Sequence, residues 1–392
     1  MKRAFVPVAS MLAIQVMISL SVLSLGVMMP VVARDLAIDA KLVGVFTAVI
    51  YGVAVAVALA AAGPIVRIGS VRVCQAALLA GAIGLALNSL ALVAATVGAV
   101  LFIGVAQGPI NPASAHILAQ RVPREYFGMV FSVKQTGTPL GFALAGLLFP
   151  ALIQWIGWRG ASLFASGMLV AAAILVEPLR PRLDVIATHA APSRSIWHSM
   201  GFVMKHRQLR VLGCSAFVYV IAQHTFTFYL VTYLYEHCGL TIAQAGALLS
   251  LSQVFGTAVR LVSGGAGDRL PRMKLLGWTG LGMTAGCVAV GFLRADTPFW
   301  LITLAVVGYG SVVISWNGTS QAEFAHLSPP GEAAAVAAVQ TALAFSGAVV
   351  GPPLFAALAS AVSYRAAFVA VALAVLIAAI WQIAAATKVS AR

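Results

Sequence analysis

Long apolar segments alternate with short polar ones along the whole 392-residue sequence. A helix needs about 20 mostly apolar residues to cross a hydrocarbon layer about 30 Å thick. The segments are continuous and rich in Ala, Leu and Gly, whereas the strands of a membrane barrel alternate apolar and polar residues. We therefore predict an all-α membrane protein with twelve transmembrane helices, at about 8–32, 43–66, 73–95, 98–119, 127–151, 160–177, 211–234, 243–264, 275–293, 299–320, 334–357 and 364–387.

The composition agrees with a membrane location. Hydrophobic residues make up 61% of the chain and charged residues 9%, against about 25% charged residues in a typical soluble protein. So few charges exclude soluble enzymes, disordered tails and secreted disulfide scaffolds. The four cysteines lie far apart without a CxxC pair, which indicates neither a disulfide framework nor a zinc site. We expect no metal and no cofactor.

The net charge of +14 comes from basic residues that are divided among the short polar segments. In a membrane protein, the distribution of these residues indicates the orientation of the chain. With the N-terminus on the inner side, inner segments carry 17 Lys and Arg residues and outer segments carry 5. Positive charge accumulates on the cytoplasmic side of membrane proteins. We therefore expect a multi-pass protein of a bacterial-type inner membrane, with both termini cytoplasmic, the lipid bilayer as partner and no nucleic-acid partner.

The chain divides into two similar halves around its longest polar stretch. We predict an N-terminal six-helix bundle at 1–177, a cytoplasmic linker with room for an interfacial helix at 178–210, and a C-terminal six-helix bundle at 211–392. Asn111 in the fourth segment and Asn317 in the tenth are 206 residues apart, and Arg159 and Arg365 keep the same offset. Internal repeats of this kind are typical of secondary transporters.

The loop between the eighth and ninth segments carries the most specific motif. It reads G-G-A-G-D-R-L-P-R-M-K from Gly264 to Lys274. This pattern resembles the loop signature G-x-x-x-D-R of the major facilitator superfamily, with Gly264, Asp268 and Arg269 at its defining positions. A glycine lets two helices approach closely, and an aspartate near a helix N-terminus is stabilised by the helix dipole.

The corresponding loop of the first half keeps Arg67 and Gly69 but has Val66 where the family usually has aspartate. We therefore expect a differently built structure there. The resemblance covers the whole chain in length, number of segments and position of the loop motif. It implies two pseudo-symmetric six-helix bundles and a transporter, with no enzymatic activity.

Two basic residues lie inside predicted helices, whereas all ten acidic residues fall in loops or at helix ends. Lys134 lies nine residues beyond Glu125, about 13 Å deeper. Arg260 lies eight residues before Asp268, about 12 Å from it along a helix. Charges at such depth are costly and usually functional. The alternatives are a hydrogen-bonded structural lysine and an arginine that extends towards the membrane surface.

In the superfamily that this chain resembles, helices five and eight face each other across a central cavity, and an arginine in helix eight recurs among carriers of oxalate and monocarboxylates. The resemblance therefore places Lys134 and Arg260 on the transport route. It also implies a polar lining from helices one, four, seven and ten. The candidates, with Gln135 beside Lys134, are Gln15, Asn111, Gln223, Tyr229, Tyr309 and Asn317. Single polar residues in such helices also serve as helix–helix contacts.

His224 lies in the middle of the seventh segment and is the candidate for proton coupling, with a hydrogen-bonded core histidine as the alternative. No Walker A loop is present to couple transport to ATP directly. We predict a secondary active transporter, a symporter or antiporter, that moves a small carboxylate-type organic anion by alternating access as a monomer. The alternatives are efflux of neutral or amphipathic drug-like compounds and a membrane sensor or scaffold without transport.

Overall fold

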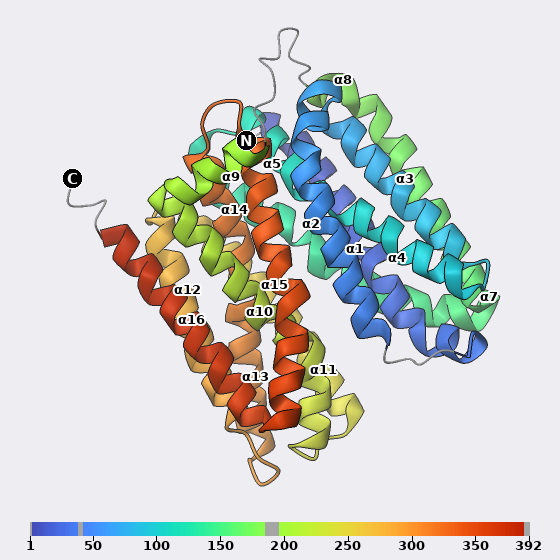
Figure 1. The fold of residues 1–392 in the computed structure, drawn as a ribbon, viewed down its shortest axis with the longest axis vertical. Helices are drawn as coiled ribbons and strands as arrows, with labels where there is room; N and C mark the ends of the chain where they lie inside the picture. The colour runs from blue at the N-terminus through green and yellow to red at the C-terminus, as the bar shows by residue number, and fades with distance from the viewer. Residues whose placement is uncertain (1, 38–41, 185–195, 388–392) are drawn as a thin grey trace. The chain divides into compact units, whose positions relative to one another are not determined.

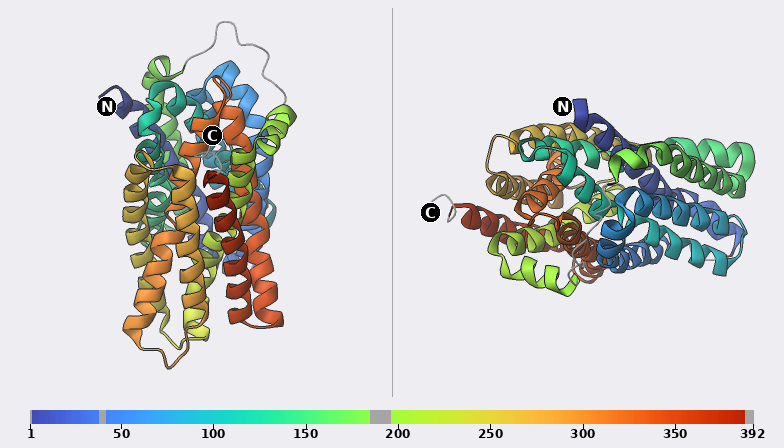
Figure 2. Two further views of the ribbon diagram at one scale, coloured as in Figure 1. Left: turned by 90° about the vertical axis from the view of Figure 1, so that its left-hand side faces the viewer. Right: turned by 90° about the horizontal axis from the view of Figure 1, so that it is seen from above.

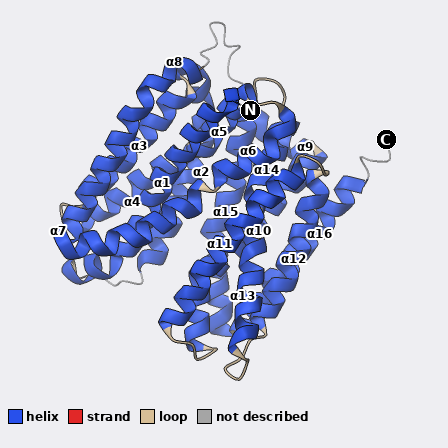
Figure 3. Ribbon diagram, turned by 180° about the vertical axis from the view of Figure 1, so that it is seen from behind, coloured by secondary structure: helices blue, strands red, loops and turns tan. Residues whose placement is uncertain are grey.

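The computed structural model describes all residues except 1, 38–41, 185–195 and 388–392, and the described chain is helical with connecting loops (Figures 1 and 3). Its helices are α1 (Lys2–Asp35), α2 (Leu42–Ile68), α3 (Ser70–Asn88), α4 (Val93–Gln107), α5 (Ile110–Arg121), α6 (Phe127–Gln135), α7 (Gly137–Val176), α8 (Arg180–Leu183), α9 (Ile196–Lys205), α10 (Arg207–Glu236), α11 (Ile242–Gly267), α12 (Arg272–Gly291), α13 (Phe299–Val313), α14 (Trp316–Leu327), α15 (Ala333–Ala361) and α16 (Tyr364–Thr387), with short 3-10 helices at Arg124–Tyr126 and Glu177–Leu179.

Eleven stretches of the described chain are long and apolar enough to cross a membrane. One of them, Arg124–Leu183, has 60 residues and contains two spans, because α7 changes direction at Gly157. The backbone there has φ 70° and ψ 168°, a conformation open to glycine and strained for other residues. The predicted all-α fold with twelve transmembrane helices is confirmed.

Two boundaries of the predicted helices are wrong. The third segment was predicted to run to about residue 95, but α3 ends at Asn88 and α4 begins at Val93. The turn between them has Ala91 at φ 56°. Its residues are mostly apolar, with Leu90 and Leu92 exposed, so hydrophobicity alone does not mark where the chain reverses.

Two predicted spans are broken in the middle by turns of two residues. The fourth consists of α4 and α5, with a turn at Gly108 and Pro109, and the tenth consists of α13 and α14, with a turn at Ile314 and Ser315. Pro109 cannot donate a helical hydrogen bond. In the tenth span, the Ser315 hydroxyl donates to the Val312 carbonyl at 2.9 Å, in competition with the helical backbone pattern. The fifth span is likewise interrupted at Thr136, between α6 and α7.

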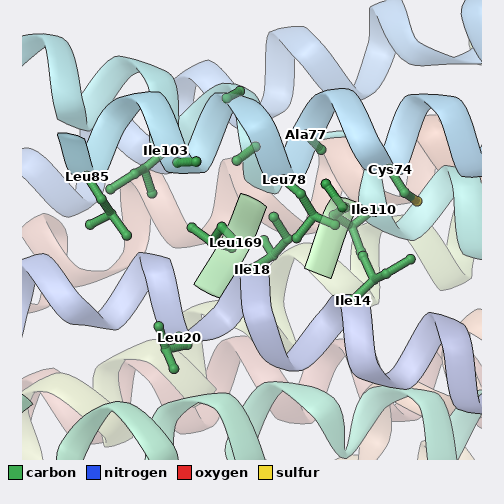
Figure 4. Close-up of a cluster of buried hydrophobic side chains, with 14 of the residues drawn as sticks. Ile14, Ile18, Leu20, Cys74, Ala77, Leu78, Leu85, Ile103, Ile110 and Leu169 are labelled. Carbon is green, nitrogen blue, oxygen red and sulfur yellow. The ribbon is translucent and has the colours of Figure 1, made fainter. Parts of the chain in front are cut away.

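Contacts between residues divide the chain into two compact units. The first contains Met1–Pro123, Val133–Gly201 and Ser328–Ala342, and the second contains Arg124–Ser132, Phe202–Leu327 and Leu343–Arg392. In the first unit, α7 packs on α1 and α3, and side chains from these helices meet in an apolar core (Figure 4). In the second unit, α12 packs against both α13 and α16 (Figure 2).

Candidate functional site

The two broken spans correspond to each other within the internal repeat. Their turns lie 206 residues apart, the same offset that separates Asn111 from Asn317. The glycine four residues before each turn marks a close contact with a neighbouring helix. A Cβ atom on Gly104 would lie 2.7 Å from the Cβ of Val53 in α2, and one on Gly310 would overlap Ser252 in α11. The backbone of the repeat is therefore preserved at both turns.

Lys134 is the buried cation of the first unit. Its side chain is fully buried, and its Nζ donates hydrogen bonds to Asn111 Oδ1 at 2.7 Å and Gln135 Oε1 at 3.1 Å. Lys134 belongs to the last turn of α6, and Asn111 is the second residue of α5, directly after the turn in the fourth span. The structure thus brings three of the predicted binding residues into contact.

Gln15 lies close to this group. The start of α7 packs so tightly on α1 that a Cβ atom on Gly137 would lie 2.8 Å from the Cβ of Gln15. Gln15 is 2% exposed, and its Nε2 donates to Ser19 Oγ at 3.1 Å. Its Oε1 is buried and accepts no hydrogen bond from the described part of the chain. An acceptor in this state is one that a water or a ligand donor can satisfy.

Arg260 is a deeply buried cation of the second unit. It is 2% exposed, and both its Nε, at 3.1 Å, and its Nη2 donate to the backbone carbonyl of Ile314. Ile314 follows the last residue of α13, where helical carbonyls lose their intrahelical donors. Arg260 therefore satisfies a carbonyl that the turn in the tenth span exposes. Side-chain patterns in the sequence give no signal for this backbone acceptor.

Gln223 joins α10 to the start of α14. Its Oε1 accepts hydrogen bonds from Trp316 Nε1 at 3.0 Å and Asn317 Nδ2 at 2.8 Å. The structure thus brings Gln223 and Asn317, both predicted binding residues, into direct contact. Trp316 is buried and follows directly after the turn at Ile314 and Ser315, so this group also borders a broken span.

The other predicted residues of the second unit make different contacts. The Tyr309 ring packs edge-on against Phe226 at 5.0 Å between centroids, and the Tyr229 ring lies 5.2 Å from that of Phe355. His224 Nδ1 lies 3.1 Å from the carbonyl of Val220 in its own helix. These contacts are the kind that hold helices together or stabilise one helix.

The loop motif of the second unit lies at a helix N-terminus. Asp268 accepts hydrogen bonds from the backbone N–H of Gly128 at 2.7 Å and of Met129 at 3.0 Å, which are the second and third residues of α6. Arg272 forms an ion pair with Asp268 at 3.3 Å and with Glu323 at 3.5 Å. A carboxylate in this position is stabilised by the free N–H groups and the dipole of the helix.

Gly264 explains how α6 comes so close to α11. A Cβ atom on Gly264 would lie 2.8 Å from the carbonyl oxygen of Gly128. The approach of these two backbones brings the end of α11 to the start of α6, where Asp268 accepts its hydrogen bonds. Arg269, the next residue of the motif, is exposed.

The first unit uses a different carboxylate in the loop where Val66 replaces aspartate. Asp184, which follows α8, accepts a hydrogen bond at 2.8 Å from the backbone N–H of Val71 in the first turn of α3. Gly69 has φ 97°, and a Cβ atom there would overlap the Asp184 carboxylate. Burial raises the pKa of Asp184, while the backbone N–H groups of Val71 and Arg72 and the charge of Arg180 act in the opposite direction. Arg67 is exposed.

Comparison with known sequences gives matches over most of the chain. A family model described as Major Facilitator Superfamily matches residues 11–347. An uncharacterised MFS-type transporter of Mycobacterium tuberculosis (strain CDC 1551 / Oshkosh) is 26% identical over 312 residues, which cover 73% of this chain and 65% of that protein's length. A probable anion transporter of Oryza sativa subsp. japonica is 30% identical over 164 residues, which cover 39% of this chain and 37% of that protein.

Solved structures show the same fold. The transporter FucP in its outward conformation superimposes with a TM-score of 0.78 at 16% identity, covering 97% of this chain and 98% of that one. The human organic anion transporter MFSD10 gives a TM-score of 0.70 at 14% identity, covering 97% and 99%. The match to the Mycobacterium tuberculosis relative spans 65% of that protein's length. The family model matches most of the chain, so this multi-pass membrane protein belongs to the major facilitator superfamily.

Proposed function

We propose that this protein is a transporter, not an enzyme, and that it moves a small organic anion of the carboxylate type as a symporter or antiporter that works by alternating access. The observation that carries the proposal is that each unit has a cation buried deep within a membrane-spanning helix. Lys134 is 0% exposed and Arg260 is 2% exposed, and both lie in membrane-spanning helices. Buried cations in such helices cost several kcal/mol and are usually kept for ligands, ions or protons.

The contacts of both cations suit an anionic ligand. Lys134 donates to two side-chain amide oxygens, and Arg260 donates to a backbone carbonyl. These oxygens accept hydrogen bonds but bring no negative charge. A carboxylate accepts hydrogen bonds from ammonium and guanidinium groups and also supplies the countercharge, which makes such bonds about twice as strong as neutral ones.

Two further facts support the proposal. The acidic residues of the sequence lie in loops or near the ends of spans, as Glu323 does close to the end of α14. The relative from Oryza sativa carries the name of a probable anion transporter, and its 30% identity over 164 residues is compatible with a shared substrate class. From the charge distribution of the sequence, we also propose an inner-membrane protein with cytoplasmic termini. We further propose that it functions as a monomer.

The proposal is tested by uptake into proteoliposomes that contain the purified protein. Radiolabelled acetate, lactate, oxalate, succinate and benzoate form the panel. We expect uptake of at least one, and a loss of about tenfold or more in Lys134→Ala and Arg260→Ala, equivalent to about 1.4 kcal/mol or more. Arg260→Lys is expected to recover part of the activity, because lysine lacks the two-pronged donor geometry of arginine.

Lys205→Ala and Arg207→Ala are the matched controls, because they remove one lysine and one arginine that are exposed. We expect both to transport at the wild-type rate. If both alanine variants of the buried cations transport the panel normally, the anion proposal is wrong, and efflux of a neutral or amphipathic compound becomes the leading function.

Proton coupling is tested in the same assay at about pH 6 and about pH 8, a range in which histidine can change its charge. We propose His224 as the coupling residue and expect His224→Gln to reduce the dependence of uptake on pH while the protein remains folded. An unchanged dependence on pH would indicate exchange of one anion for another instead.

A further inference from the structure

We infer that, in each unit, the turn in the broken span holds the buried cation when no substrate is bound, and that the substrate displaces this contact. Asn111 and the carbonyl of Ile314 would then be positioning groups that compete with the substrate for Lys134 and Arg260. This inference rests on the proposed function, since the competitor must be an anion.

Both cations reach from one span to the turn of another: Lys134, in the last turn of α6, to Asn111 two residues beyond Pro109, and Arg260 from α11 to Ile314 within its turn. The two contacts belong to different units and use different chemistry, an amide side chain and a backbone carbonyl. Both nevertheless end on a neutral oxygen, one within the turn and one two residues beyond it.

The turns do not require the cations. At the repeat position of Arg260, the first unit has Ala54, and α2 packs directly on the turn there: a Cβ atom on Gly108 would lie 2.8 Å from the Ala54 carbonyl. At the repeat position of Lys134 in the C-terminal half, 206 residues later, lies the neutral Gln340, which is 5% exposed and belongs to the first unit by its contacts. Each half of the chain thus keeps its broken span although it lacks the cation of the other half.

The competing contacts of the two cations differ in strength. A carboxylate forms stronger hydrogen bonds with an ammonium or guanidinium group than an amide or carbonyl oxygen does. Substrate binding would therefore release Asn111 from Lys134 and the Ile314 carbonyl from Arg260. The Ile314 carbonyl lies at the end of a helix, where it lacks an intrahelical N–H donor. A ligand that changes the contacts of a turn in this way favours one conformation of the span over another, as alternating access requires.

The experiment measures the dissociation constants of the five panel carboxylates for the purified protein by thermal stabilisation. We expect Asn111→Ala to bind the panel several-fold more tightly than the wild type, because a neutral competing hydrogen bond is removed. Asn111→Asp is expected to bind about tenfold more weakly or worse, because a permanent carboxylate occupies Lys134. Lys134→Ala is expected to lose binding to a similar degree.

Asn88→Ala is the control, since Asn88 is a buried asparagine of the first unit that donates to Ser162 at 3.0 Å in a different place. It is expected to leave the dissociation constants unchanged even if it lowers the melting temperature. Unchanged dissociation constants together with a lower melting temperature in Asn88→Ala would show that a change in binding after Asn111→Ala does not come from a general loss of stability.

The contact at Ile314 is tested by fluorescence, because Trp316 lies two residues away and is buried. We expect the panel carboxylates to change the emission of the wild type, and both Trp316→Phe and Arg260→Lys to reduce that change. If the panel carboxylates leave the Trp316-dependent emission unchanged, the Ile314 carbonyl is not released, and this part of the inference is wrong.

The outcomes separate this inference from the proposed function. If no panel carboxylate stabilises the wild type, the proposed anion is wrong, and the inference fails with it. If the wild type binds but Asn111→Ala binds more weakly or equally well, the anion stands and the competition is refuted. If Asn111→Ala does not fold, the loss of binding in Asn111→Asp decides, since its absence would refute the competition.

Discussion

The two broken spans have the same backbone and different chemistry. Both make a two-residue turn at the same position of the repeat, after a glycine that packs closely on a neighbouring helix. At the first turn, α2 meets Gly108 through small residues, and the cation Lys134 comes from α6. At the second turn, the cation Arg260 comes from α11 itself. The fold repeats its geometry, and the departures from the repeat indicate where function lies.

The helix N-termini show a similar contrast. Asp268 in the second unit accepts two backbone N–H groups of α6 and pairs with Arg272. Asp184 in the first unit accepts a hydrogen bond from Val71 in the first turn of α3, although the two residues are 113 positions apart in the chain. Both units place a carboxylate at a helix start, but only the first draws it from the segment between the two halves. The loss of aspartate at Val66 is therefore accompanied by a different contact, made at another helix.

The largest expected effect concerns the glycines that define the shared backbone. Gly104→Ala and Gly310→Ala should each lower the free energy of unfolding by about 1–3 kcal/mol, because an added methyl group would meet the adjoining helix at too short a distance. The measurement is thermal unfolding in detergent. Equal losses in both units would sharpen the comparison.

The same helices supply the controls for these two variants. A Cβ atom on Gly308 in α13 would meet nothing within 4 Å, and one on Gly98 in α4 would lie 3.5 Å from Leu87, an ordinary contact. We expect Gly308→Ala and Gly98→Ala to be neutral or slightly stabilising, since alanine favours a helix. A loss at Gly308 as large as that at Gly310 would mean that packing at the turn is not the cause.

A smaller effect distinguishes the two carboxylates. Asp268→Asn should lower the free energy of unfolding by about 1–2 kcal/mol, since it removes a charged acceptor of two N–H groups and the partner of Arg272. Asp184→Asn should be neutral or slightly stabilising at neutral pH. Burial raises the pKa of Asp184, so its ionised form opposes folding and its protonated form, which asparagine resembles, does not.

The dependence on pH follows from the direction of that shift. As the pH falls through the raised pKa, the folded state takes up a proton more readily than the unfolded state, and the wild type gains stability. The difference between the wild type and Asp184→Asn should therefore shrink in acid. A difference that grows as the pH falls would contradict the assigned role of burial.

The sequence was sufficient for the fold and for part of the site. Continuous apolar segments predict the twelve helices, and the repeat identifies Asn111 and Asn317, which both lie directly after a turn. The turns themselves were missed. Pro109 marks one of them, but the other lies between Ile314 and Ser315, and a serine in a membrane helix gives no clear signal of a break.

The contacts of the cations depend on tertiary structure. Lys134 was recognised from its depth along the fifth span, and its neighbour Gln135 from adjacency, but the acceptor of Arg260 is a backbone carbonyl that no residue type reveals. Tyr309 and Tyr229 lie in helices that the resemblance predicts to line the transport route. The structure shows both in ring packing, which hydrophobic patterns cannot distinguish from exposure to a cavity.

The most direct test is an experimental structure of the protein with the panel carboxylate that is taken up fastest. We predict a carboxylate oxygen about 3 Å from Lys134 Nζ or the Arg260 guanidinium, with the corresponding contact to Asn111 or the Ile314 carbonyl broken. A carboxylate bound elsewhere, while Lys134 remains 2.7 Å from Asn111 and Arg260 remains on Ile314, would contradict it.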